Sequence, residues 1–398
     1  MSKWKSARSF VELAFAIDKH LPGYVDAYFG PEEIKESTNA KQKLELEELS
    51  TTLGQIVIST QQDATLTDAR REYLSAELKA MQTTLRILKG EEIDIVEETQ
   101  GLYGLMPVWI EERVFEEAHR VIEELLPGSG TLPERMKGFE EKTVIPEEEL
   151  EPIIKNLADD FQRRTLEIIS LPEDESCEYA LVQDKPWAGY NWYLGKYASR
   201  IDINTDLPTF AAFIPRLVAH EAYPGHHTEH AMKEKELYRD RGYLENSIQP
   251  LNAPSCVISE GVAENALEMI ATPDETIQIY QSILQQAGLK QVHGDQIYQI
   301  SEARRALDKF SINAILLLHG EGASDEEVVN YGVRYALITE QESKKYLEFF
   351  KDPLSRSYGF LYPLGYELVH NYVGNGEDRI KRFARLLREP ITTSQLIH

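Results

Sequence analysis

The chain is poor in cysteine, in basic residues and in long apolar segments. Its two cysteines, Cys177 and Cys256, are too few for a disulfide framework and are typical of a reducing compartment. The N-terminal segment MSKWKSARSFVELAFAIDKHLPG lacks the apolar core and the small-residue cleavage site of a signal peptide. No apolar run approaches the ~20 residues that span a membrane. We therefore expect a cytoplasmic protein with no membrane partner.

The shortage of basic residues leaves a strong negative charge. There are 67 acidic residues against 42 lysines and arginines, for a formal net charge of −25. Such a charge repels the phosphates of nucleic acids and favours solubility. A hydrophobic fraction of 42% in 398 residues is enough for a substantial core. We therefore expect a globular protein that binds no nucleic acid, with its oligomeric state left open.

Helical periodicity, with apolar residues three and four positions apart, runs through most of the chain. The expected helices cover residues 33–58, 67–89, 111–126, 147–170, 209–223, 226–238, 257–271, 295–319, 324–339, 342–350 and 376–388. Ser324 and Glu327 form a capping box at the start of one of them. The expected fold is mainly α.

Residues 178–206 alternate aromatic or β-branched residues with polar ones, which is typical of strands. We expect them to form one small antiparallel β-sheet. Its aromatic side chains either line a cleft or pack the sheet on the helices; they are Trp187, Tyr190, Trp192 and Tyr193. The change in composition divides the chain into an N-terminal helical section, 1–172, and a second section, 173–398, with one continuous domain as the alternative.

The second section contains the segment HEAYPGHHTEH at residues 220–230, with four of the ten histidines of the chain. A His-Glu pair followed by another histidine is typical of zinc hydrolases, in which two imidazoles bind the metal and the glutamate is the general base. Bound Zn²⁺ lowers the pKa of a coordinated water from 15.7 to about 7. The motif predicts a Zn²⁺ cofactor, with His220 as a ligand and Glu221 as the base.

A third ligand is expected from another helix. The best candidate is Glu260, 39 positions after Glu221, in the segment SEGVAE. Gly261 would allow another backbone to approach this helix closely. Glu264 lies one helical turn further along the same face, where it would orient a ligand histidine through the second ring nitrogen.

The spacing of the histidines requires a break in the helix. In a regular helix His226 points away from His220, and His227 regains the face of His220 only about 10.5 Å along the axis. That distance is too long for two Zn–N bonds of about 2.0–2.1 Å. Pro224-Gly225 favours a break. We therefore predict His226 as the second ligand and His227 as an outer-sphere or surface residue.

A second metal motif overlaps the first. The segment from His226 to His230, HHTEH, matches the inverted H-x-x-E-H pattern, in which Glu229 would be the base. This arrangement needs no helix break. It remains an alternative to the first one, in which His230 has no metal role.

The motifs together resemble the DUF885 family. The resemblance rests on HEAYPGHH, on the Glu-Gly-x-Ala segment that begins at Glu260, and on a C-terminal Tyr-x-x-Gly at 362–365. It covers about residues 180–395, and GYVDAYFGP at 23–31 is similar more weakly. This family is regarded as metallopeptidase-like and related to the helical gluzincins, which include thermolysin-like and neurolysin-like enzymes. It implies a large helical zincin-type fold with a cleft beside the small sheet.

The resemblance also implies residue roles. It makes His220, His226 and Glu260 the metal ligands and Glu221 the base. Tyr362, in the Tyr-x-x-Gly element, would either donate a hydrogen bond to the oxyanion of a tetrahedral intermediate or be a core or rim tyrosine, one of 20 in the chain. The family's usual tryptophan after Glu-Gly is Val262 here, and the tyrosine expected three residues later is Asn265.

Other polar residues have two possible roles each. His319 follows an apolar helix and matches a histidine of the family, so it would stabilise the oxyanion or cap the helix. Arg356, Arg304 and Arg305 would bind a substrate carboxylate or form structural ion pairs.

The resulting hypothesis is a zinc-dependent hydrolase, either a metallopeptidase or a carboxypeptidase-like enzyme, that acts on a peptide or small amide. An extended peptide is expected to bind along the edge of the sheet at 178–206. Two alternatives remain open. One is a metal-dependent hydrolase of non-peptide amides or esters, and the other is a catalytically silent metal-binding relative.

Overall fold

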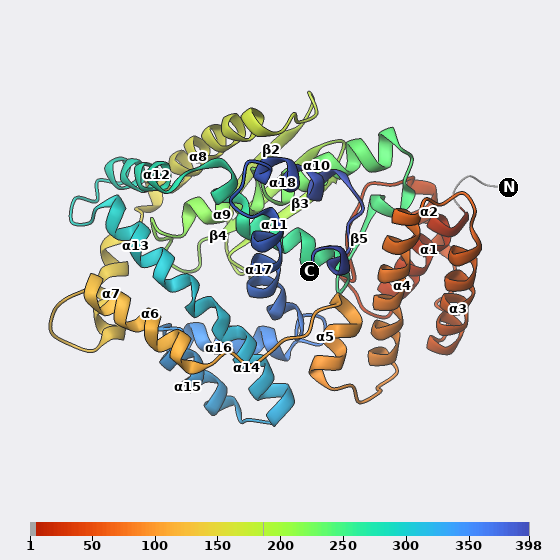
Figure 1. Ribbon diagram of the computed structural model, residues 1–398, viewed down its shortest axis with the longest axis horizontal. Coiled ribbons are helices and arrows are strands. Elements are labelled where there is room, and N and C mark those ends of the chain that lie inside the picture. Colours follow the sequence, from red (N-terminus) through yellow and green to blue (C-terminus); the bar gives the residue numbers. More distant parts are fainter. Residues whose placement is uncertain (1–4, 186, 398) are drawn as a thin grey trace.

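The computed structural model describes residues 5–185 and 187–397. Helices dominate it, as expected, and the strands are short (Figure 1). The helices of the first half are α1 (Lys5–Asp18), α2 (Glu32–Ala40), α3 (Leu46–Gln62), α4 (Asp68–Leu88), α5 (Ile95–Tyr103), α6 (Glu112–Leu125), α7 (Leu132–Glu140) and α8 (Glu147–Ile168). Those of the second half are α9 (Ile214–Glu221), α10 (His226–Lys233), α11 (Pro254–Ile270), α12 (Pro273–Gln286), α13 (Gly294–Arg305), α14 (Phe310–Leu316), α15 (Asp325–Tyr335), α16 (Glu340–Lys351), α17 (Leu361–Val373) and α18 (Arg379–Arg388).

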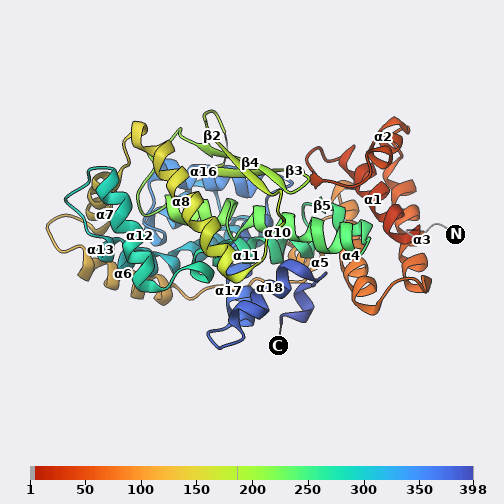
Figure 2. The same ribbon diagram turned by 90° about the horizontal axis from the view of Figure 1, so that it is seen from above.

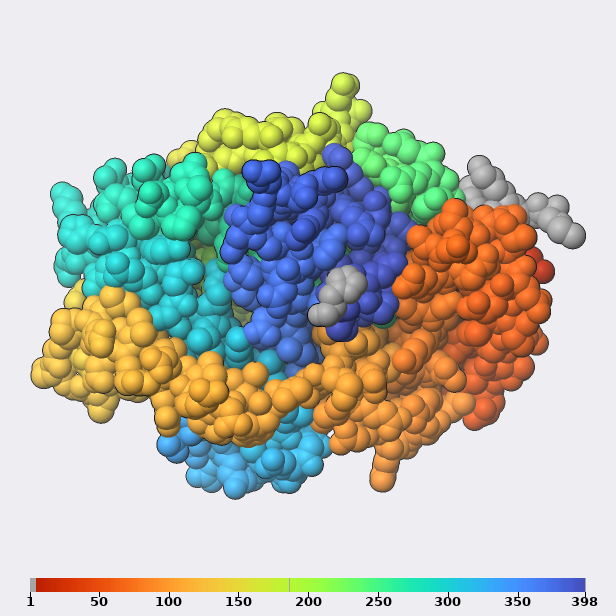
Figure 3. Space-filling view, viewed as in Figure 1, coloured from red at the N-terminus to blue at the C-terminus, as the bar shows by residue number. Residues whose placement is uncertain are grey.

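The helices form two ends around a central pair. Helices α1 to α4 lie at the right of Figure 1, and α6, α7, α12 and α13 lie at the left. Between them α11 packs closely on α17. Residues of α17 and α18 cover the middle of the face in Figure 3. Within the described residues, none of the helices combines the length and the apolar character needed to cross a lipid bilayer.

The predicted strand region forms a sheet of three strands, β2 (Ser176–Val182), β3 (Gly189–Gly195) and β4 (Ala198–Asn204), along one side of the molecule (Figure 2). Their order is β2-β4-β3. β3 and β4 are antiparallel because Lys196 and Tyr197, both with positive φ, form a two-residue hairpin turn. β2 is parallel to β4. The sheet is therefore mixed, and the expectation of an antiparallel sheet is wrong, because β2 runs in the same direction as β4.

A second sheet was not predicted. β1 (Val25–Tyr28) pairs antiparallel with β5 (Ile248–Pro250). Both strands are too short to show an alternating pattern, and their partners are more than two hundred residues apart in the chain. This pairing joins the N-terminal helices to the region that follows α10.

Among the described residues, the two largest of four apolar clusters lie in different parts of the molecule. One lies between α1, α3 and α4 and includes Phe10, Leu74 and Leu78. The larger one contains residues from α6 and α8 together with residues from α9 and α12 to α16. The sections 1–172 and 173–398 therefore share this core.

Several helix ends differ from those expected. Residues 33–58 form two helices, and α3 starts at a capping box of Glu45 and Glu48. Residues 295–319 are divided into α13, a 3-10 turn at Leu307–Lys309, α14 and a π-helix at Leu317–Glu321. Neither break contains proline, so periodicity gave no sign of it. The capping box of Ser324 and Glu327 is confirmed.

Two glycines allow α11 and α17 to approach closely. A Cβ on Gly261 would lie 2.4 Å from the carbonyl oxygen of Gly365. A Cβ on Gly365 would lie 2.9 Å from the carbonyl oxygen of Val257. The predicted close approach at Gly261 is confirmed, and it brings the start of α17 near Glu260.

Candidate metal centre

The helix that carries the His-Glu pair ends directly after it. α9 ends at Glu221 and α10 begins at His226, so the predicted break is confirmed. A Cβ on Gly225 would lie 1.9 Å from the carbonyl oxygen of His220 and 2.4 Å from that of Ala219. Only glycine fits there, and its N–H donates to the Ala219 carbonyl at 3.0 Å. The break turns the ring of His226 back toward that of His220.

His220, His226 and Glu260 converge on one point. The Nε2 atoms of the two histidines are 3.1 Å apart. Oxygens of Glu260 lie 3.5 Å from Nε2 of His220 and 3.9 Å from Nε2 of His226. Two nitrogens bound tetrahedrally to Zn²⁺ at about 2.0–2.1 Å would lie roughly 3.3 Å apart. Within residues 5–185 and 187–397 this is the one ligand group compact enough to hold a metal ion.

The contacts among the three side chains leave a polar atom unsatisfied that a metal ion would bind. Oε2 of Glu260 is buried and has no hydrogen-bond partner among the described groups. Oε1 accepts from the Tyr358 hydroxyl at 2.7 Å. An unpartnered buried oxygen is costly, and a cation between the three side chains would satisfy it. Two nitrogens and one oxygen also match the donor set of catalytic zinc sites.

His220 is held through its second ring nitrogen. Its Nδ1 lies 3.3 Å from Oε1 of Glu264, and Arg216, one turn earlier in α9, lies 3.2 Å from Oε2. Burial raises the pKa of Glu264, but His220 and Arg216 outweigh burial and bring this pKa to about 2. An ionised carboxylate at this position would orient the imidazole.

His226 has an outer partner that was not predicted. Its Nδ1 lies 3.1 Å from Oγ of Ser259, whose hydroxyl donates to Glu229. Glu229 also pairs with Lys233 at 2.5 Å. Because the Ser259 hydroxyl is used toward Glu229, its oxygen accepts from Nδ1–H of His226 and leaves Nε2 free for a metal. In the sequence, the position of Ser259 directly before Glu260 was the one indication that it could contact His226.

The centre attracts positive charge. Burial lowers the pKa of His226, but Glu229, Glu260 and Glu221 outweigh burial and raise it to about 9. Burial likewise lowers the pKa of His220, and Glu264 more than offsets this effect. Carboxylates therefore favour a cation where the two rings face each other.

Glu221 has the surroundings of a general base. Its side chain is 7% exposed, and its backbone carbonyl accepts from Nδ2 of Asn191, on β3, at 2.7 Å. In the described part of the chain no group donates a hydrogen bond to its carboxylate. Burial raises the pKa of Glu221 against the attraction of both ligand histidines. A raised pKa brings a carboxylate closer to the working range of a base.

Tyr362 lies at the solvent side of the centre. It is 38% exposed, yet burial together with Glu260 and Glu221 raises its pKa. Its ring contacts that of Tyr358 at 5.9 Å. Tyr358, which binds the ligand Glu260, was not predicted.

The inverted H-x-x-E-H arrangement is not assembled. His230 stacks on Tyr193 with ring centroids 5.0 Å apart, and burial lowers its pKa to about 3. Glu229 is engaged by Ser259 and Lys233 instead.

Two other predicted histidines bind elsewhere. His227 is fully buried, because one residue of helix turns it away from His226. Its ring nitrogens lie 2.8 Å from Oγ of Ser199 and 2.8 Å from Glu175, so it links the sheet to α10 instead of contacting substrate or the ligands. His319 binds the carbonyl of Phe350 at 2.7 Å, a packing contact at the end of its helix.

The arginines form structural ion pairs. Arg356 makes a two-contact pair with the buried Glu98. Arg304 and Arg305 pair with glutamates as well. Among the described residues these contacts occupy the guanidinium groups that were candidates for a substrate carboxylate.

Asp26 reaches the centre from the N-terminal part of the chain. It lies on β1, within GYVDAYFGP, and accepts a hydrogen bond from the Tyr190 hydroxyl. Burial raises the pKa of Asp26, and its electrostatic neighbours include two of the predicted metal ligands, His226 and Glu260. The ring of Tyr190 contacts Trp187 at 5.4 Å and Trp192 at 4.5 Å. Three of the four aromatic residues predicted as a cluster therefore contact one another, and Tyr190 connects them to Asp26.

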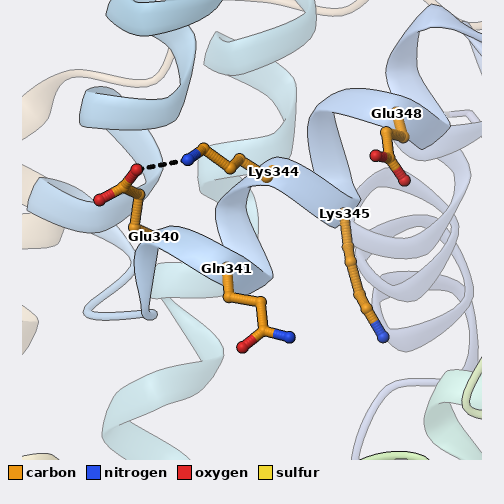
Figure 4. A pocket seen from close by; sticks show the side chains of 5 residues that line it. All are labelled: Glu340, Gln341, Lys344, Lys345 and Glu348. Carbon is orange, nitrogen blue, oxygen red and sulfur yellow. Dashed lines mark hydrogen bonds and ion pairs between the residues drawn. The ribbon is translucent and has the colours of Figure 1, made fainter.

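A surface hollow of about 550 Å³ lies over α16 and has no part in this centre (Figure 4). Its lining comes from one helix face: Glu340, Gln341, Lys344, Lys345 and Glu348. Glu340 and Lys344 pair at 2.5 Å across one turn. The lining is a solvated charged face without any of the predicted site residues.

Comparison with known proteins identifies the fold only. No family model matches the chain, and no curated protein matches it. A structure described as "the putative lipoprotein from Colwellia psychrerythraea" is similar with a TM-score of 0.52 at 15% identity, over 88% of this chain and 68% of that one. "A putative lipoprotein of unknown function from Shewanella oneidensis" has a TM-score of 0.53 at 11% identity, over 88% of this chain and 72% of that one. The chain thus shares a mainly helical fold with these two proteins.

Proposed function

We propose that the protein is a zinc-dependent hydrolase of the metallopeptidase type, with a DUF885-like site. The observation that supports this best is the convergence of two Nε2 atoms and a buried, unpartnered carboxylate oxygen, from His220, His226 and Glu260. A structural zinc site is closed by four protein ligands, whereas a catalytic site has three and an open position. Three ligands with Glu221 beside them favour catalysis over a silent relative.

The residues have distinct tasks in this proposal. Zinc, when bound, supplies Lewis acidity and makes a coordinated water acidic near neutral pH. Glu221 accepts the proton of the attacking water on its carboxylate and passes it to the leaving amine. Glu264 and Ser259 hold the ligand imidazoles by Nδ1. Tyr362 donates to the oxyanion, a role worth roughly 2.7–4 kcal/mol.

The edge of the sheet supports a peptide substrate. β3 is an edge strand. The N–H of Asn204 donates to the Ala188 carbonyl, so alternate residues from 188 onward pair with β4. Gly189 and Asn191 then direct their backbone groups outward. Because the Asn191 side chain binds the Glu221 backbone, an extended peptide added at this edge would pass the base.

The alternatives use the same atoms. A non-peptide amide or ester would need the same zinc and base.

We propose a cytoplasmic location from the two free cysteines, Cys177 and Cys256. The lipoprotein descriptions of the two structural neighbours favour the cell envelope instead. Fractionation of cells that express the native gene would decide between the two.

Metal analysis combined with a base variant tests the function. We expect about one zinc per chain in the wild type and in Glu221→Gln. Hydrolysis of a mixed peptide library, followed by mass spectrometry, should be 10²–10⁴-fold slower in the variant, roughly the contribution of a general base. Glu178→Gln, an exposed change on β2 with the same loss of charge, is the matched control.

Three outcomes would contradict the proposal. A protein that takes up no zinc has no metal centre, and a variant that works at the wild-type rate does not use Glu221. Cleavage of esters with every peptide left intact would favour the non-peptide alternative.

A further inference from the structure

Strand β1 brings to the metal centre a carboxylate that the proposed chemistry does not use. Asp26 accepts from the Tyr190 hydroxyl through Oδ1. Its electrostatic neighbours include His226 and Glu260. Among the described residues no lysine or arginine pairs with it, and Tyr190 is its side-chain partner. Its second oxygen is therefore available.

The other carboxylates of the centre have cations. Glu264 lies 3.2 Å from Arg216, and Glu229 lies 2.5 Å from Lys233. Zinc would balance Glu260 and Glu221. Asp26, in contrast, pairs with no lysine or arginine among the described residues, and its side-chain partner is the Tyr190 hydroxyl. Burial raises the pKa of Asp26, and a cation beside it would offset that cost.

The aromatic cluster supplies a second feature that favours a cation. The ring of Tyr190 lies between those of Trp187 and Trp192, at 5.4 and 4.5 Å. Trp192 is 44% exposed. Aromatic faces attract ammonium groups, and tryptophan does so most strongly. A carboxylate with an exposed aromatic cluster next to it is a combination suited to an organic amine.

We propose that Asp26, oriented by Tyr190, whose ring contacts Trp187 and Trp192, binds a positively charged amino group of the substrate and so determines specificity. This rests on the proposed hydrolase function. The free α-amine of a peptide and the side chain of a lysine share this chemistry. If the amine is the α-amine, the enzyme removes residues from the N-terminus.

Binding measurements separate this proposal from the hydrolase function. Zinc-loaded Glu221→Gln is titrated with an alanine pentapeptide, with its N-acetylated form, and with an N-acetylated form that carries one lysine. We expect the acetylated alanine peptide to bind about tenfold more weakly than an amine-bearing peptide, as loss of a charge-assisted contact implies. Preference for the free N-terminus identifies the α-amine, and preference for the lysine peptide identifies the side chain.

Variants then assign the effect to Asp26. Asp26→Asn in the same background should weaken amine-bearing peptides about tenfold and the acetylated alanine peptide less than twofold. Tyr190→Phe keeps the ring, so it tests the orientation of Asp26 even if Asp26→Asn does not fold, and it should act in the same direction. Glu178→Gln should change the affinity of neither the amine-bearing peptides nor the acetylated alanine peptide.

Equal losses for charged and acetylated peptides, no loss in either variant, or no binding of any peptide would overturn the proposal. If discrimination persists while the wild type hydrolyses nothing, the hydrolase function fails and the amine site stands.

Discussion

The N-terminal core and the layer behind the metal centre are equally buried and chemically opposite. Phe10, Leu74 and Leu78, in the core of α1, α3 and α4, are 0% exposed. In α10, His227 and Glu229 are also 0% exposed. The first region excludes water with aliphatic and aromatic groups, whereas the second encloses ionisable ones.

The two regions differ in how their burial is stabilised. Apolar packing requires the right volume and tolerates many sequences. A buried charge requires a specific partner for nearly every polar atom. Glu229 has two such partners, Ser259 and Lys233. The N-terminal core therefore raises the free energy of unfolding. Burial of the polar layer lowers it, and this burial holds two imidazoles in place.

Removal of a ligand from the polar layer should have the largest effect. His226→Ala and His220→Ala should each lose stoichiometric zinc and all hydrolysis, because two donors do not hold the ion. His230→Ala should keep the metal, since His230 stacks on Tyr193. Elemental analysis after gel filtration measures this. Zinc loss in His230→Ala with retention in His220→Ala would restore the inverted motif.

A cavity in the apolar core should reduce stability without affecting the metal. Leu78→Ala should lower the free energy of unfolding by about 2–5 kcal/mol, the usual cost of such a truncation. Urea unfolding gives that value, and zinc content of the folded protein should stay unchanged. A variant that folds normally but binds no zinc would show that the two regions are coupled.

Glu77 connects the regions and should make stability depend on pH. It lies on α4 and accepts from the N–H of Ser255, near the start of α11, at 3.0 Å. Burial raises its pKa from 4.5 to about 7. Its contribution to stability is therefore complete below pH 4.5 and is lost as pH rises through 7, by roughly 3 kcal/mol.

Glu77→Gln should remove that dependence, because the amide does not ionise. The difference between the unfolding free energies at pH 5 and at pH 8 should be smaller in the variant than in the wild type, by roughly 3 kcal/mol. If both proteins show the same pH dependence, Glu77 does not titrate in this range.

The smallest expected effect concerns the outer partner of His226. Ser259→Ala should lower zinc affinity about 10–100-fold by releasing the imidazole. Ser255→Ala, one turn earlier in α11 and equally buried, is the control and should keep the wild-type affinity. Competition with a chelator measures both. Equal affinities would show that Glu229 and Ser259 do not support the ligand.

Helical periodicity predicted the helical class and the ends of several single helices, such as α6 and α8. It also joined α2 to α3, where the break is made by a capping box instead of proline or glycine. In the candidate metal centre, the local geometry was predictable where the spacing of residues within one segment was informative. Pro224-Gly225 between two histidines is such a case, and the observed break agrees with it.

The sequence by itself determined the helical class, the position of the helix break and the candidate ligands, because these depend on local geometry and on the chemistry of residue types. Tertiary structure alone decided that Asp26 lies beside the centre, that Ser259 and Glu229 support His226, and that Arg356 pairs with Glu98. These contacts join segments far apart in the chain. A single sequence carries no periodic or spacing signal for them, since only packing brings such segments together.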